Sequence, residues 1–300
     1  MAMVKLKPVD NRFQADVWEQ ALSAEGVAYR LRTFQDTAYD GLYVSQKGYG
    51  VFYVEEADLA KAEELVAALG QEDTPGLDSA AALAGVIEHT LLSPEAGEKE
   101  LTAHLEQCRE MGCVAACVSP WMVPLAVRGL EGSGVAVCTV VGFPLGTQSL
   151  GTKLAEAQEL AQAGATELDM VLNRGLALGG AMGQAVDEAA QLAQAIAPAR
   201  LKVILETSEL GPEMSAQAAQ ALALSGAAFL KTGSGYFGPA TVEDVNILAD
   251  NGGGLGIKAA GGIKTLDAAL ALLEAGATRL GTSSGWSIYR EAQERWSQED

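Results

Sequence analysis

The sequence FLKTGSGYFG, residues 229–238, begins as an apolar strand and ends as a loop of glycine and small hydroxyl residues. Lys231 stands between the two parts, and a buried ammonium group is costly unless it is paired or neutralised. Similar short apolar segments recur along residues 81–300, and Ala- and Leu-rich helical stretches separate them. They are GVIEHTLL, CVAACVSP, VAVCTVVGFP, ELDMVLN, LKVILET, GIKAAGG and RLGTSSG. Alternating strands and helices predict parallel βαβ units, and eight such units predict an α/β fold of the (β/α)8 TIM-barrel type.

Residues 1–70 follow a different pattern, which predicts a small α+β domain. KLKPV, VAYRLRTF and GVFYVE are predicted strands, and helices are predicted over 14–24 and 58–69. The order weakly resembles small ferredoxin-like domains of prokaryotes whose role is unassigned. The polar segment QEDTPGLDSA, 71–80, is predicted to be a linker. Four basic residues of this domain form either a basic binding face or simply the solvated side of the strands: Lys5, Lys7, Arg30 and Arg32.

Composition excludes several classes of function. The formal net charge of -19 argues against nucleic acid and anionic membranes as partners. No apolar run is long enough to span a membrane and no targeting signal is recognised, so a cytoplasmic protein is expected. The four cysteines lack paired CxxC spacing and are expected to be reduced and buried. The two histidines, His89 and His104, form no ligand-spaced cluster, so no metal requirement is expected.

A repeated spacing indicates which side chains line the barrel. Counting five residues on from Gly112, Gly134, Gly164, Gly226 and Gly276 leads to Cys117, Thr139, Asp169, Lys231 and Gly281. The equal offset predicts that these five residues lie at one height, and strand alternation turns Asp169 and Lys231 inward. The same alternation places further polar side chains inside, namely Glu88, Lys202, Glu206 and Lys258. These groups form either a structural ion-pair network or an active site, and their place near the C-terminal ends of strands favours the active site.

The loops after the last three strands are suited to binding an anion. They read TGSGYFG, AGGIK and GTSSG, and such turns expose backbone N–H groups beside hydroxyl donors. A lysine attacks a carbonyl only when it is neutral, and burial beside a second cation such as Lys258 favours the neutral amine. Asp169 is suited to moving protons. This combination predicts Schiff-base aldol chemistry on a small phosphorylated sugar.

Taken together, the segments from about residue 84 to 290 resemble the 2-deoxyribose-5-phosphate aldolase family. The resemblance implies a class I aldolase without metal or cofactor, which cleaves 2-deoxy-D-ribose 5-phosphate to D-glyceraldehyde 3-phosphate and acetaldehyde. It places the Schiff base on Lys231 and proton transfer on Lys258 and Asp169, with Lys202 and Cys117 beside the substrate. The phosphate contacts that it implies are Ser234, Gly235, Gly261, Gly262, Gly281, Ser283 and Ser284.

The sequence departs from the family at two places. Glu88 stands where Asp is common, and Thr232, Gly233 and Ser234 stand where Thr-Ser-Thr is common. The first change adds a methylene beside the lysines, and the second removes a hydroxyl near the phosphate loop. The resemblance does not cover the N-terminal domain, and a homodimer is the candidate assembly. Two alternatives remain open: another Schiff-base phosphosugar aldolase, and a non-catalytic phosphosugar sensor that signals through residues 1–70.

Overall fold

The chain divides into two compact units, Met1–Gly76 and Leu77–Asp300. The structure is a computed structural model and describes residues 3–9, 18, 22, 26–33, 50–70 and 79–297. Most of the predicted linker and most of the predicted helix over 14–24 lie outside the described residues. Each unit is therefore described by itself.

The N-terminal unit contains the three predicted strands, and they form a small antiparallel sheet. Its strands are β1 (Met3–Val9), β2 (Tyr29–Thr33) and β3 (Gly50–Glu55), in the order β1-β3-β2. The short helix η2 (Glu56–Asp58) leads into α3 (Leu59–Gly70). Phe52 is fully buried, with the rings of Trp18 and Tyr29 each 5.6 Å from its own. Lys5, Lys7, Arg30 and Arg32 are exposed.

The second unit is a closed barrel of eight parallel strands, which confirms the predicted TIM barrel. The order around it is β10-β11-β4-β5-β6-β7-β8-β9. The strands are β4 (Ile87–Leu91), β5 (Ala115–Val118), β6 (Ala136–Val141), β7 (Glu167–Val171), β8 (Arg200–Ile204), β9 (Phe229–Lys231), β10 (Gly256–Ala260) and β11 (Arg279–Thr282). All are short and most are rich in apolar residues, which suits strands that are covered on both faces.

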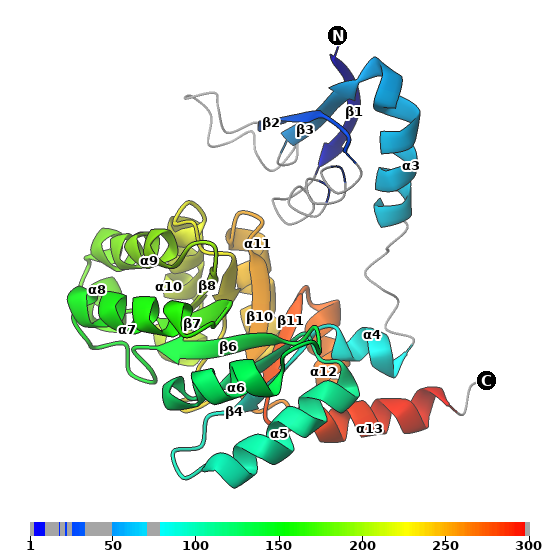
Figure 1. The fold of residues 1–300 in the computed structure, drawn as a ribbon. Helices are drawn as coiled ribbons and strands as arrows, with labels where there is room; N and C mark the ends of the chain where they lie inside the picture. Colours follow the sequence, from blue (N-terminus) through cyan, green and yellow to red (C-terminus); the bar gives the residue numbers. More distant parts are fainter. Residues whose placement is uncertain are drawn as a thin grey trace. The chain divides into compact units, whose positions relative to one another are not determined.

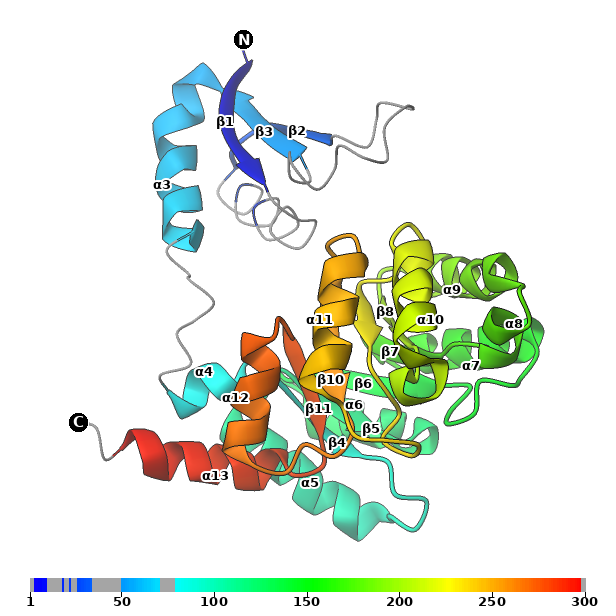
Figure 2. The same ribbon diagram turned by 180° about the vertical axis from the view of Figure 1, so that it is seen from behind.

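Helices surround the barrel on its outer side (Figures 1 and 2). They are α4 (Ala80–Ala84), α5 (Glu98–Met111), η3 (Pro120–Met122), α6 (Val123–Gly129), α7 (Leu150–Gln162), α8 (Arg174–Leu178), α9 (Met182–Ile196), α10 (Thr207–Leu222), α11 (Val242–Asn251), α12 (Leu266–Glu274) and α13 (Gly285–Trp296). Side-chain hydroxyls cap the starts of α7, α11 and α12, at Ser149, Thr241 and Thr265. Within the described part of the chain, no helix is both long and apolar enough to cross a membrane.

The main hydrophobic core lies between the strands and the helices. Leu168, Met170, Val203 and Leu230 belong to it, so these residues point outward from the barrel. Their neighbours in sequence point inward, and this decides which polar side chains meet at the centre.

The five-residue spacing predicts the interior correctly except at β6. Cys138 and Val140 belong to the small interior cluster, whereas Val137 and Val141 belong to the outer core, so Thr139 faces outward. Thr139 donates its hydroxyl proton to the Val118 carbonyl at 2.9 Å. The prediction was wrong here because helix α6 already ends at Gly129, so Gly134 is not the cap of that helix. Cys138, not Thr139, pairs in register with Cys117.

Candidate active site

Asp169 is the centre of a buried group of charges at the top of the barrel. Its Oδ2 accepts hydrogen bonds from Lys231 Nζ at 2.9 Å and from Lys258 Nζ at 2.6 Å. Its Oδ1 accepts from Lys202 Nζ at 3.0 Å. Lys231 and Lys258 are direct partners in the register of β9 and β10, which is why one carboxylate oxygen can hold both. The structure therefore brings together the predicted nucleophile, the second lysine and the carboxylate.

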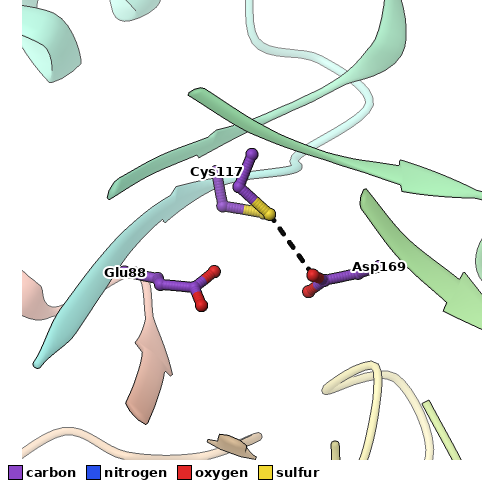
Figure 3. Close-up of side chains that lie close together, drawn as sticks. Glu88, Cys117 and Asp169 are labelled. Carbon is purple, nitrogen blue, oxygen red and sulfur yellow. Dashed lines mark hydrogen bonds between the residues drawn. The ribbon is translucent and has the colours of Figure 1, made fainter. Parts of the chain in front are cut away.

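Glu88 completes the group from β4. Its carboxylate accepts a hydrogen bond from Lys258 and lies 3.2 Å from Lys202 Nζ. Figure 3 shows Glu88, Cys117 and Asp169 pointing toward one another across the interior. Glu88 is one methylene longer than the Asp that is common at this position in the family, and its carboxylate still contacts both Lys202 and Lys258.

A second layer of charges lies deeper in the barrel, at the starts of β7 and β11. Arg279 donates to Glu88 Oε1 at 3.1 Å and to Glu167 Oε2 at 3.0 Å. Glu167 Oε2 also lies 2.6 Å from Lys202 Nζ, so this layer is continuous with the first. Arg200 pairs with Glu167 from the rim, where 46% of its side chain is exposed.

The pKa values of these groups follow from a competition between burial and ion pairing. Burial would raise the pKa of Glu88, but the ammonium groups of Lys202 and Lys258 outweigh it and hold the pKa at about 2. Burial would likewise raise the pKa of Asp169, and its lysine partners hold it well below its usual range. Burial would lower the pKa of Lys258, but Asp169 and Glu88 raise it. Glu88, Asp169 and Lys258 are therefore charged across the physiological pH range.

Two thiols border this group. Cys138 Sγ lies 3.3 Å from both Asp169 Oδ1 and Lys202 Nζ. Four side chains of this region each offer one possible metal-ligand atom, and these atoms lie within 4.8 Å of one another, a spacing that could hold a metal ion. They are Glu88, Cys117, Cys138 and Asp169. However, lysines already bind both carboxylates, so the arrangement fits a proton-transfer network better than a cation site.

A pocket of about 330 Å³ opens directly above Lys231. All seven residues that were predicted to contact phosphate line it: Ser234, Gly235, Gly261, Gly262, Gly281, Ser283 and Ser284. Lys231 lines it too, although only 3% of the residue is exposed, whereas Lys202, Lys258 and Asp169 do not line it. Among the described residues, Lys231 is thus the member of the charged group that reaches from the interior into the pocket.

The loops of the pocket differ in which N–H groups remain for an anion. Ser234 N–H donates to Glu206, and Ser284 N–H donates to Thr282 Oγ1 at 2.9 Å. Over the described residues, the N–H groups of Gly235, Gly262 and Ser283 make no hydrogen bond within the protein. Ser234 and Ser284 are therefore left with their hydroxyl groups as donors, and the other three with backbone N–H groups.

Gly261 allows two of these loops to approach closely. Its φ is 116°, and a Cβ there would lie 2.7 Å from the Gly238 carbonyl oxygen. A side chain at this position would push the β9 and β10 loops apart and widen the pocket.

Glu206 stabilises the loop after β9 by accepting hydrogen bonds from its backbone. It is fully buried, its φ is 63°, and its two carboxylate oxygens accept from Ser234 N–H at 3.0 and 3.1 Å. A Cβ on Gly233 would lie 2.8 Å from Glu206 Oε1. The missing hydroxyl at Gly233 therefore makes room for a carboxylate that fixes the loop.

His89 faces away from the site, as its parity predicts. It stacks on His104 with ring centroids 4.4 Å apart, and its Nε2 lies 3.0 Å from Gln107 Oε1 on α5.

Four residues of the candidate site were not predicted from the sequence: Cys138, Glu167, Arg279 and Lys264, which lines the pocket. Period-two counting from Asp169 and Gly281 would have found Glu167 and Arg279, and Lys264 ends the AGGIK loop.

Comparison with known proteins shows what the barrel is. Residues 85–291 match the model of the DeoC/LacD family aldolases. The chain belongs to this aldolase family.

Among its relatives, a deoxyribose-phosphate aldolase from Caldanaerobacter subterraneus subsp. tengcongensis is 42% identical over 70% of this chain and 93% of its own length. One from Crocosphaera subtropica is 44% identical over 69% of this chain and 93% of its own length. The solved structure described as a tetrameric deoxyribose phosphate aldolase from Aeropyrum pernix has a TM-score of 0.67 and 30% identity, over 77% of this chain and 97% of that one. The family match begins at residue 85, after the N-terminal unit, which ends at Gly76.

Proposed function

We propose that this member of the family is a class I deoxyribose-phosphate aldolase that forms a Schiff base on Lys231. The observation that carries the proposal is the position of Lys231, which lies between a buried ion-pair network and a glycine- and serine-rich anion cradle. A phosphate bound in the cradle would leave the other end of a five-carbon sugar close to the lysine. The names of the relatives support the same substrate.

The reaction begins when neutral Lys231 attacks the C1 aldehyde of the open-chain sugar. Loss of water from the carbinolamine gives an iminium ion, which accepts electrons as the C2–C3 bond breaks and a base removes the C3 hydroxyl proton. D-glyceraldehyde 3-phosphate leaves with carbons 3 to 5. The two-carbon enamine is then protonated at C2 and hydrolysed to acetaldehyde.

Asp169 and Lys258 are proposed to move the protons of this reaction. Asp169 Oδ2 accepts hydrogen bonds from both the Lys231 amine and the Lys258 amine, so a proton can pass between these groups through Asp169. Lys202, Glu88 and Cys117 are fully buried and do not line the pocket, and they are proposed to lie behind Lys231 at the reacting end of the substrate. The seven cradle residues are proposed to bind the phosphate, with Lys264 as an added cation at the mouth.

For the rest of the chain, we propose a linker over 71–80 and an aldolase domain over 81–300. Residues 1–70 would form a ferredoxin-like domain of unassigned role. The same proposal includes a cytoplasmic location, a homodimer, and no nucleic-acid partner or cofactor. The net charge of -19 supports the absence of a nucleic-acid partner.

Reductive trapping tests the proposed function. Incubation with acetaldehyde and borohydride should leave one ethyl group on the peptide that contains Lys231, and Lys231→Met should take up none. The unmodified protein should cleave 2-deoxy-D-ribose 5-phosphate to the two named aldehydes. An adduct on Lys202 or Lys258, or a phosphosugar bound without turnover, would contradict the proposal.

A further inference from the structure

The ion-pair network inside the barrel holds one more cation than anions. Its buried cations are Lys202, Lys231, Lys258 and Arg279, and its buried carboxylates are Glu88, Glu167 and Asp169. We call these seven residues the interior network. Arg200 also touches Glu167, but its side chain is 46% exposed, so water screens its charge.

An unbalanced charge in a dry interior is unfavourable, and the loss of one proton makes the interior network neutral. Arginine does not lose its proton in proteins. Lys202 contacts all three carboxylates and Lys258 contacts two, which keeps both protonated. Lys231 contacts Asp169 alone among the described carboxylates, and it lines the pocket through which a proton can leave. The excess proton of the interior network is therefore the one on Lys231.

Arg279 and Glu167 determine this balance without touching Lys231 or the pocket. Arg279 bridges Glu88 and Glu167 and stacks over the Phe229 ring, 5.1 Å from its centroid. Its charge reaches the nucleophile through Glu88, Lys258 and Asp169.

We infer that Arg279 and Glu167 are positioning residues that set how readily Lys231 becomes neutral, because they fix the charge count of the interior network. The inference rests on the proposed Schiff base at Lys231. Removing Arg279 leaves three cations against three carboxylates, so Lys231 keeps its proton. Removing the charge of Glu167 has the opposite effect, and removing both restores an excess of one cation.

Other titratable groups also face Lys231 from the elements around it. The thiols of Cys117 on β5 and Cys138 on β6 border Asp169. Glu206, after β8, accepts from Ser234 N–H, and Lys264 lines the pocket. All four remain in every variant proposed below, so they act on each variant in the same way.

The test measures the rate of borohydride-trapped imine formation with acetaldehyde from pH 5 to 9, in the full-length protein. The acid limb of this profile reports how readily Lys231 becomes neutral. We expect Arg279→Met to move the limb up by about one pH unit and Glu167→Gln to move it down by about one unit. The double variant should return the limb to the wild-type position. Arg200→Met is the matched control, because it removes a screened cation from the same carboxylate, and it should barely move the limb.

These outcomes separate charge from structure. Damage to packing would slow all variants without moving the acid limbs of their rate profiles in opposite directions. If Arg279→Met does not fold, Arg279→Lys retains the charge and should keep its acid limb at the wild-type pH. Single variants that move the limb in the same direction, or leave it unmoved, would overturn the inference. If the wild-type protein traps no imine, the proposed function fails; if it traps one on Lys231 and the limbs do not move, only this inference fails.

Discussion

Lys258→Met removes the cation nearest to the proposed nucleophile at similar side-chain length. Lys258 Nζ and Lys231 Nζ share one oxygen of Asp169, at 2.6 and 2.9 Å, so the two ammonium groups lie at most about 5.5 Å apart, and a separation of ~4 Å serves for an order-of-magnitude calculation. At an effective dielectric constant of ~20, two such charges repel by ~4 kcal/mol, equivalent to ~3 pH units. Asp169 between them and water in the pocket reduce this, so we expect the acid limb of kcat/KM to move up by about 1 to 2 units.

The assay is the rate of deoxyribose 5-phosphate cleavage from pH 5 to 10, with circular dichroism to verify folding. Part of the lost activity should return in alkaline buffer, but recovery should be incomplete because Lys258 is also proposed to transfer protons together with Asp169. The variant also leaves Glu88 and Asp169 without one partner, which should destabilise the barrel by about 3 to 5 kcal/mol. A slow, folded variant whose acid limb coincides with the wild type would refute the electrostatic role of Lys258.

Three further predictions concern stability, packing and domain organisation. The pKa of Glu88 falls from 4.5 to about 2 on folding, so its stabilising contribution of about 3 kcal/mol is present above pH 4.5 and is lost as the pH falls from 4.5 to 2. The free energy of unfolding, measured as a function of pH, should therefore decrease over this range, and Glu88→Gln should make that decrease smaller. Gly281→Ala places a methyl group 2.8 Å from Lys258 Cε, so kcat should fall at least about tenfold while the circular dichroism spectrum stays unchanged. A wild-type kcat in this variant would show that Lys258 can shift without loss of activity. A chain that starts at Ser79 should fold and keep kcat within about threefold, because the site residues all come from the barrel; a folded but inactive product would show that residues 1–78 complete the site.

The sequence alone determined the barrel and the centre of the site. Alternating strands and helices specify a parallel barrel, and period-two alternation within FLKTG and ELDMV turns Lys231 and Asp169 to the same interior. Glycine-rich loops after three consecutive strands predict an anion-binding site, and all seven of the predicted residues line one pocket. These are local features, and each follows from the residues of one segment.

Only the tertiary structure decided how the segments meet. Helix α6 ends at Gly129, well before Gly134, so the count from that glycine selects Thr139 whereas Cys138 faces the interior, and the sequence spacing alone does not show where the helix ends. Closure of the barrel joins Glu88 on β4 to Arg279 on β11 and to Lys258 on β10, across 191 and 170 residues of sequence. The number of charges that share this interior is a property of the closed barrel, because each ion pair depends on strands that are neighbours only after folding.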